Sequence, residues 1–289
     1  MRTLFRTSVI VLITLFMSVP AFAWGDPGHM AVAQIAYDNL NQTAKARVDQ
    51  LARQVVFENN RYNFVTLACW MDDIRDEPAL EPLKDWHFIT QRFIVSGPAV
   101  DEPPPPVNVQ SILDWSIARL RARRDSERVQ AYTLAYLVHL TGDVHQPLHS
   151  TTRYTVAMPD GDLGGNRFRL SSNAIRPNLH SYWDGVAGFF DSANLSRPLN
   201  RSERQRLRAF TRAIQQDFPA SDIDEVDDLT PATWVTESHD LAKTVAYTDI
   251  TENTVPSIPY RDKTRDTSRR RIATAGYRLA RVLNEVLSN

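Results

Sequence analysis

The chain has 289 residues and a formal net charge of −1, because 33 lysines and arginines nearly balance 34 aspartates and glutamates. This balance excludes a polycation that holds nucleic acid or anionic lipid by bulk electrostatics. With 43% hydrophobic and 23% charged residues, the composition is that of a soluble globular protein, which excludes collagen, a long coiled coil and bulk disorder. A single cysteine excludes an internal disulfide framework.

Residues 1–23 have the pattern of a secretory signal peptide. Two arginines give a positive start, an apolar run of residues 9–17 follows, and Ala21-Phe-Ala23 forms a small-residue cleavage signal. The run is too short to span a bilayer comfortably, although an uncleaved membrane anchor is the alternative interpretation. We therefore predict a secreted or periplasmic protein without a membrane anchor after processing. Its mature chain starts at Trp24 and has a net charge of −3.

Most of the mature chain carries apolar residues at helical spacing. The segment 129–146 is largely apolar, so we expect its helix to be central, and Asn41 is suited to cap the second helix. The last helix buries one stripe that includes Ile272, Leu279 and Leu283. The predicted helices cover residues 29–40, 43–56, 64–73, 109–123, 129–146, 202–218, 231–247 and 267–287.

Strand signals are few and short. Residues 88–89 with 93–95 predict one hairpin, and residues 167–170 contribute to a second. A long loop over residues 153–166 is rich in glycine and aspartate, and loops of this length are often functional. No composition break or repeat divides the chain. The predicted fold class is therefore mainly α, a single helical domain over residues 24–289 with a few short β-hairpins.

The seven histidines indicate where the chemistry lies, since three of them fall within residues 139–149. His139 and Asp143 are four residues apart, so on a helix they project from the same face. His180 and Asp184 repeat this spacing. An imidazole nitrogen and a carboxylate oxygen on one face are what a divalent ion such as zinc needs from two ligands.

One such pair alone is more often a surface hydrogen bond or a helix ion pair. Two pairs in apolar surroundings are different. His139 stands in the run Tyr-Leu-Val-His-Leu, where an unpaired imidazole would be costly. Asp72 and Asp73 follow a Cys-Trp pair, and His87 follows a tryptophan. The residues alone therefore predict a metal site.

Eight sequence motifs resemble those of a single protein family. They are Trp24-Gly-x-x-Gly-His29, Trp70-x-Asp72, His87-Phe88-Ile89, His139-x-x-Gly-Asp143-x-x-Gln-Pro-Leu-His149, Gly164-Gly165-Asn166, Asn178-Leu-His-Ser-x-Trp-Asp184, Trp234-x-x-Glu237-Ser238 and Ala275-Gly-Tyr-Arg-Leu-Ala280. Together they resemble the zinc-dependent single-strand-specific nucleases, typified by the fungal nucleases S1 and P1, with plant and bacterial members. The lack of cysteine pairs indicates a bacterial-type member.

The resemblance implies three Zn²⁺ ions in a cleft of the helical fold. It assigns the first to Asp72, His87, His139 and Asp143, the second to His149, His180 and Asp184, and the third to His29, the shared Asp143, and the amino nitrogen and carbonyl of Trp24. A free amine exists at Trp24 only after cleavage in front of it. Export and metal assembly are thereby predicted to be coupled. Metal ions about 3.5–4 Å apart can hold and deprotonate a water.

The resemblance also implies a monomeric endonuclease that cuts single-stranded DNA and RNA to 5′-phosphorylated products, with 3′-nucleotidase activity on nucleotides. Arg75 and Asp143 are the catalytic residues that it implies, with Arg75 neutralising transition-state charge. Phe88 would stack a base, Asn166 would contact a base edge, and Thr90 stands where fungal members have an aspartate that binds the base. The residues alone allow an ordinary structural role for each of these side chains. Arg75 fits equally a solvent-exposed helix arginine, Phe88 a core aromatic, and Asn166 an ordinary turn.

Some alternatives remain open at this point. His145 either supports a ligand or competes with one. A zinc-dependent phospholipase C shares the ligand set and the processed tryptophan, but usually ends its last histidine–acid pair in glutamate, where this chain has Asp184. A helical protein that binds zinc without catalysis is the third hypothesis. Because structural zinc sites usually have four protein ligands, the three-ligand second site favours catalysis.

Overall fold

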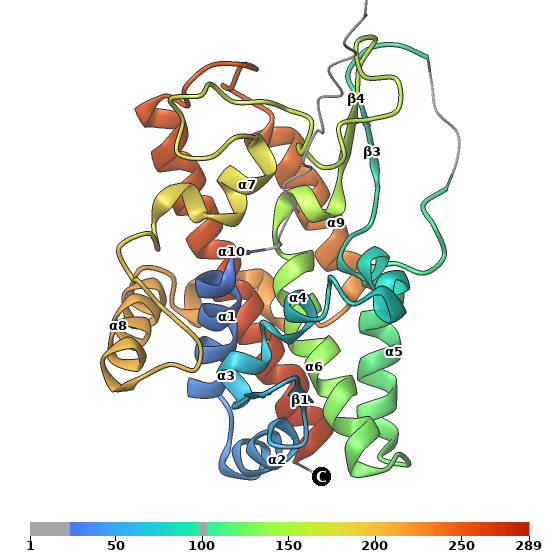
Figure 1. Ribbon diagram of the computed structural model, residues 1–289, viewed down its shortest axis with the longest axis vertical. Helices are drawn as coiled ribbons and strands as arrows, with labels where there is room; N and C mark the ends of the chain where they lie inside the picture. Colours follow the sequence, from blue (N-terminus) through green and yellow to red (C-terminus); the bar gives the residue numbers. More distant parts are fainter. Residues whose placement is uncertain (1–23, 99–102, 289) are drawn as a thin grey trace, which may run out of the picture.

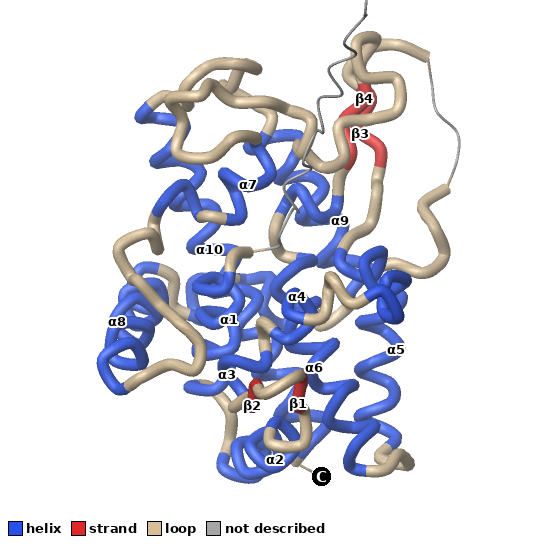
Figure 2. The backbone as a smooth tube through the Cα atoms, viewed as in Figure 1, coloured by secondary structure: helices blue, strands red, loops and turns tan. Residues whose placement is uncertain are grey.

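The computed structural model describes residues 24–98 and 103–288, and the predicted signal peptide of residues 1–23 lies outside this part. The fold is mainly α, as the helical periodicity predicts (Figures 1 and 2). The α-helices are α1 (Asp26–Asp38), α2 (Gln42–Ala52), α3 (Phe64–Leu67), α4 (Trp70–Asp73), α5 (Val109–Ala122), α6 (Glu127–Val144), α7 (Leu179–Asp184), α8 (Arg201–Asp217), α9 (Pro231–Leu241) and α10 (Ile258–Leu287). Within the described residues, none of these helices has the length and apolar character to cross a membrane.

Short helical turns connect these elements, and two of them carry residues discussed below. The ten-residue 3₁₀ helix η1 spans Pro78–His87, and η2 spans Pro147–Ser150 directly after α6. The remaining turns are η3 (Val186–Gly188), η4 (Ala220–Asp222), η5 (Asp224–Asp227) and the π-helical η6 (Ala242–Ala246).

The core forms where α1 and α10 cross. In Figure 1, α10 runs through the centre of the molecule with α1 against it, while α5 and α6 pack together beside them. The crossing is close because Gly276 of α10 has no side chain: a Cβ there would lie 2.6 Å from the Cβ of Ile35. The predicted central helix is α6, whose residues are buried on nearly all sides from Leu137 to Val144. This core fixes α1 and α6 rigidly relative to each other.

Side-chain caps set several helix starts, as the sequence suggests. The Asn41 side chain accepts the backbone N–H of Ala44 at 2.9 Å, which confirms the predicted cap of α2. Asn178 caps α7 in the same way, because its side chain accepts the N–H of Ser181 at 2.8 Å. This cap begins the short helix that carries His180.

The strand predictions are wrong in detail. Within the described residues, β structure is limited to one antiparallel pair, β1 (Val56–Phe57) with β2 (Asn60–Arg61), and one parallel pair, β3 (Arg92–Ile94) with β4 (Thr152–Tyr154). The predicted hairpin over residues 88–95 is absent because β3 finds its partner 60 residues further along the chain. Residues 167–170 form only an isolated bridge, between Arg169 and Asn178.

Two helix predictions also need correction. The predicted helix over residues 64–73 is two short helices, α3 and α4, which break between Leu67 and Trp70. The last helix begins at Ile258, nine residues before its predicted start at residue 267. Its first turns bury Thr264 and Ser268 where the hydrophobic pattern would require apolar residues, so the periodicity is not visible there.

Candidate metal centre

Buried histidines and aspartates converge in three groups within the described residues. In each group the nitrogen and oxygen atoms available as ligands lie within 4.8 Å of one another. The groups are His29, His139 and Asp143; Asp72, His87 and His139; and His149, His180 and Asp184. The structure thus brings together all eight side chains that the resemblance names as zinc ligands. They come from α1, α4, η1, α6, η2 and α7.

Asp143 lies between the first two groups. Its Oδ1 atom is 3.3 Å from Nε2 of His29, while its Oδ2 atom is 3.0 Å from Nδ1 of His87 and 3.3 Å from Nε2 of His139. One carboxylate therefore presents a different oxygen to each group, as a bridging ligand must. Gly142 makes this possible, because a Cβ there would lie only 2.8 Å from Nδ1 of His29.

The second group has the spacing of a zinc site. The Nε2 atom of His139 is 3.0 Å from Nδ1 of His87 and 3.9 Å from Oδ1 of Asp72. Zinc bonds of about 2.0–2.1 Å in a tetrahedron place neighbouring ligand atoms about 3.3–3.4 Å apart. The observed distances lie on both sides of this value, so the group fits a tetrahedral cation.

The third group has the arrangement that points most directly to a bound cation. The Nδ1 atom of His149 donates to the His87 carbonyl at 2.8 Å, and that of His180 donates to the Gly164 carbonyl at 2.7 Å. With the hydrogen on Nδ1, each Nε2 atom carries a lone pair. These two Nε2 atoms face each other at 3.1 Å, with Asp184 Oδ2 at 3.5 Å from that of His180. Only a proton or a metal ion between the lone pairs makes this contact favourable.

The same groups hold buried atoms that lack hydrogen-bond partners among the described residues. They include both ring nitrogens of His29, both carboxylate oxygens of Asp72, Oδ1 of Asp143 and Oδ2 of Asp184. Leaving buried carboxylates unsatisfied costs free energy, and such groups in native proteins are normally paired or coordinate metals. Together with the neutral imidazoles, this donor set fits zinc.

Burial controls the protonation of these side chains. It lowers the pKa of His149 to about 4 and that of His180 to about 3, so both are neutral and able to ligate at neutral pH. The same burial raises the pKa of Asp184 well above its usual range. For His139 burial acts to lower the pKa, but the neighbouring carboxylates, led by Asp143, outweigh it and raise the pKa to about 9. A cation among these carboxylates would displace that proton.

Trp24 lies beside two of the groups. Its side chain is fully buried against Gly28 in the first turn of α1. The backbone N–H of the next residue, Gly25, donates to the Asp184 carbonyl at 3.0 Å. The chain at Trp24 therefore runs between the helix that carries His29 and the helix that carries Asp184.

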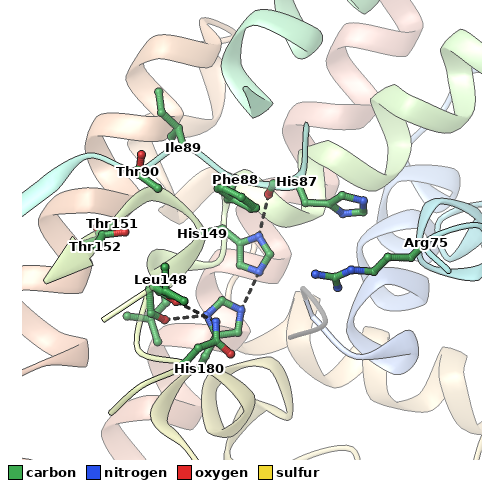
Figure 3. Close-up of a pocket in the computed structure, with 13 residues that line it drawn as sticks. Arg75, His87, Phe88, Ile89, Thr90, Leu148, His149, Thr151, Thr152 and His180 are labelled. Atoms are coloured by element: carbon green, nitrogen blue, oxygen red, sulfur yellow. Dashed lines mark hydrogen bonds between the residues drawn. The ribbon is translucent and has the colours of Figure 1, made fainter. Parts of the chain in front are cut away.

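A pocket of about 330 Å³ opens onto the third group. Its wall includes the four side chains that the sequence predicts to act on substrate: Arg75, Phe88, Thr90 and Asn166. Figure 3 shows the guanidinium of Arg75 directed toward the histidines that line the pocket, with Phe88 beside His149. The Arg75 guanidinium also lies 4.0 Å from Oδ1 of Asp72. Cation-binding groups, a positive charge and an aromatic face are thus all within one pocket.

The family model described as S1/P1 Nuclease matches residues 24–288. The chain belongs to the S1/P1 nuclease family. Nuclease S1 of Aspergillus oryzae is 25% identical to it over 95% of this chain and 96% of that protein. Endonuclease 3 of Arabidopsis thaliana is 26% identical, covering 97% and 94%, and Nuclease P1 of Penicillium citrinum is 27% identical, covering 91% and 97%. The predicted family and the predicted helical fold are both confirmed.

Gln146 of this S1/P1 family member belongs to the His139–His149 motif, and the structure gives it a contact with the third group that the sequence did not predict. It is fully buried, its Nε2 atom donates to Oδ1 of Asp184 at 2.7 Å, and its Oε1 atom accepts the N–H of Leu148 at 2.6 Å. Gln146 thereby orients one carboxylate oxygen of Asp184 and leaves the other directed at the histidines. A polar residue between His145 and a proline in an otherwise buried motif was the available signal.

The structure also resolves the role left open for His145. This residue is buried but belongs to none of the three groups, because its ring nitrogens contact the Thr141 carbonyl at 2.8 Å and Arg278 at 3.0 Å. It is therefore not a competing ligand. His239 is half-buried and contacts the Thr151 hydroxyl at 3.0 Å through its Nδ1 atom.

Proposed function

We propose that this chain is an exported, zinc-dependent endonuclease that hydrolyses single-stranded DNA and RNA to 5′-phosphorylated products. It would also act as a 3′-nucleotidase. The observation that carries the proposal is the set of buried, unpartnered histidine and aspartate atoms next to the pocket of Arg75 and Phe88. The nuclease names of the relatives support the same reaction class.

We assign three zinc ions to the groups described above. Asp143 would be shared between the first two sites, since its two oxygens face different histidines. His149, His180 and Asp184 would hold a separate ion. In the mature protein the amino and carbonyl groups of Trp24 would complete the site of His29, and the position of Trp24 between α1 and α7 supports this. The signal peptide of residues 1–23 must then be removed before assembly, in a secreted or periplasmic protein.

The bound ions would supply Lewis-acid stabilisation of phosphate charge and a water of lowered pKa. The protein groups orient the substrate around them. Arg75 would bind a non-bridging phosphate oxygen and stabilise the charge that develops as the oxygen of water attacks phosphorus. The bond from phosphorus to the 3′ oxygen then breaks, which leaves the phosphate on the 5′ side.

Substrate selection would come from the apolar pocket wall. A base that stacks on Phe88 gains about 1–3 kcal/mol for any sequence, but only an unpaired base exposes its ring face. Thr90 and the amide of Asn166 would contact the edge of that base. The Asn166 amide nitrogen donates one N–H to the Leu163 carbonyl at 2.8 Å, so its oxygen and its second N–H are available for a base. We therefore expect a preference for single strands.

Zymography tests this function. Mature protein would be assayed on single-stranded DNA, RNA and duplex DNA, with and without a chelator, and on phosphatidylcholine vesicles. We expect chelator-sensitive cleavage of the single strands, slow cleavage of the duplex, and products with 5′-phosphates. Chelator-resistant cleavage, or faster turnover of phosphatidylcholine than of nucleic acid, would overturn the proposal.

A further inference from the structure

A second buried polar cluster lies at the end of α6, next to the metal groups but separate from them. It consists of His145, Glu237, Arg271 and Arg278, and we refer to it as the arginine cluster. His145 and both arginines are at most 3% exposed. Glu237 accepts from Arg271 at 2.8 Å and from Arg278 at 2.7 Å. The arginine cluster thus joins α9 and α10 to the residue that follows α6.

Arg278 has a partner for each N–H of its guanidinium. Its Nη1 donates to Glu237 at 2.7 Å and to Nε2 of His145 at 3.0 Å. Its Nη2 donates to the other oxygen of Glu237 and to the Glu225 carbonyl, both at 2.7 Å, and its Nε donates to the same carbonyl at 3.1 Å. A planar guanidinium with every donor in use has one orientation only.

The arginine cluster and Ser238 of α9 also provide hydrogen-bond donors at the C-terminal end of α6. The last carbonyls of a helix have no partner within it and need donors from elsewhere. Here each carbonyl from residue 141 to 145 has one. The pairs are Thr141 with Nδ1 of His145 (2.8 Å), Gly142 with the N–H of His145 (3.1 Å), Asp143 with the N–H of Gln146 (2.9 Å), Val144 with the Ser238 hydroxyl (2.5 Å), and His145 with Nε of Arg271 (3.3 Å).

The end of α6 is also where the proposed metal ligands lie. Asp143 is in its last turn, and His149 follows in η2. α9 packs against η2 and also contacts α6. Its Ser238 bonds the Val144 carbonyl, and the neighbouring His239 bonds Thr151 just after η2. The same helix therefore holds the chain directly after Asp143 and again just after His149.

We propose that the arginine cluster, together with Ser238 of α9, positions Asp143 and His149 for metal binding, with Arg278, Glu237 and Ser238 as positioning residues. This inference rests on the proposed metal centre. It explains two of the sequence motifs that contact neither metal nor substrate, Trp234-x-x-Glu237-Ser238 and Ala275-Gly-Tyr-Arg-Leu-Ala280. Both supply their polar residue to this cluster.

Charge supports a geometric role over a purely stabilising one. The arginine cluster buries two guanidinium groups against one carboxylate, and buried ion pairs are often no more stabilising than apolar residues of the same volume. The excess positive charge lies at the negative, C-terminal end of the α6 dipole, where a cation is favourable. Directional hydrogen bonds to that helix end are what apolar residues would not provide.

Zinc affinity is the readout that separates positioning from stability. Mature wild-type protein and Arg278→Lys would be titrated with zinc against a chromophoric chelator, and urea unfolding of the metal-free proteins would be followed in parallel. Lysine keeps the positive charge but lacks the planar guanidinium with its several donors in fixed directions. We therefore expect zinc affinity to fall about 10–100-fold, as for other residues that orient metal ligands. Val286→Ala, eight residues further along α10 and buried, is the control for lost stability. Its zinc affinity should stay within about twofold.

A second variant covers the case in which Arg278→Lys does not fold. Ser238→Ala removes the donor to the Val144 carbonyl and the acceptor of Arg271 Nη2 at 3.0 Å, while both arginines keep their bonds to Glu237. It should weaken zinc binding in the same direction. If a folded variant loses no more zinc affinity than Val286→Ala, the positioning role is wrong. If wild-type protein itself binds no zinc, the proposed metal centre fails instead, so the two failures are distinguishable.

Discussion

Two faces of one helix end show opposite ways of burying polar groups. On the metal face of α6, His29, Asp72 and Asp143 keep buried atoms without hydrogen-bond partners. On the side of the arginine cluster, each N–H of Arg278 is paired, and so is each carbonyl from residue 141 to 145. Both sets are fully buried, so solvent does not explain the difference. In our proposal the unpaired set receives zinc, and the paired set holds the shape of the site.

This difference gives the two faces different stability in the metal-free protein. A carboxylate that is buried without a cation opposes folding. A carboxylate paired to two guanidinium groups does not, but removing one partner of such a pair leaves an uncompensated charge and strongly destabilises the fold. Substitutions on the two faces should therefore act differently on activity and on metal-free stability.

The largest expected effect is on activity, from Asp143→Asn. Because Asp143 faces two of the three groups, its loss should reduce cleavage of single-stranded DNA by about 10³-fold or more, even in excess zinc. Initial rates on a labelled oligonucleotide would measure this. Asp262→Asn on the surface is the control and should leave the rate unchanged. A loss below tenfold in Asp143→Asn would show that the metal face is not the reaction centre.

The next effect is on stability and compares one carboxylate from each face. Glu237→Gln should lower the free energy of unfolding of the metal-free protein by about 3 kcal/mol, because it breaks an ion pair in which both arginines are buried and the Glu237 side chain is 22% exposed. Asp184→Asn should raise it at pH 7, because burial raises the pKa of Asp184 and so disfavours its ionised form in the folded state. Urea unfolding with and without zinc would measure both.

In the zinc-loaded protein the order should change, with Asp184→Asn now less stable than wild type because it binds zinc more weakly. Destabilisation of the metal-free protein by Asp184→Asn would contradict the view that this face is unsatisfied without a cation.

Phe88→Ala should weaken substrate binding without changing the metal groups or the arginine cluster. Loss of base stacking worth about 1–3 kcal/mol corresponds to a fall in kcat/KM of roughly 5–150-fold on single strands. Zinc affinity and the urea midpoint should stay at wild-type values, and Phe88→Tyr should restore most of the activity. Equal kcat/KM for Phe88→Ala and wild type would remove Phe88 from the substrate site.

The smallest expected effect is a pH dependence of the stability that the arginine cluster contributes through Glu237. Burial acts to raise the pKa of Glu237, but Arg278 and Arg271 outweigh it and hold the pKa below the ordinary value of 4.5. Glu237 therefore stabilises the folded state above pH 4.5, and this contribution is lost as the pH falls through the lowered pKa. The difference in unfolding free energy between metal-free wild type and Glu237→Gln should shrink below pH 4.5. A difference independent of pH from 7 to 3 would contradict the ion pair.

Sequence analysis could predict the elements and residues whose signals are local. The spacing of His139 and Asp143 indicated a shared helical face, and the Asn41 cap and the central helix followed from neighbouring residues. The two histidine–aspartate pairs predicted a metal site from the residues alone, but the full set of eight proposed ligands came from resemblance to a family, since no local rule links Asp72 to His149. Their convergence depends on how six separate elements meet in space, which a single sequence does not reveal.

Other features depend on contacts between distant segments. β3 pairs in parallel with β4 across 60 residues, so a hairpin was the wrong expectation from adjacent strand signals. The start of α10 buries Thr264 and Ser268, which hides its period. His145 remained undecided because its partner, Arg278, is 133 residues away. In each case the missing information was which residues meet in space.

The central claim is that the unpaired atoms of the metal face are zinc ligands, completed by the amine of Trp24. Elemental analysis of the mature protein, compared with a form that keeps one extra residue before Trp24, tests it most directly. We predict three zinc ions per chain in the mature protein and two in the extended form. Two or fewer in the mature protein, or equal counts in both forms, would contradict the account.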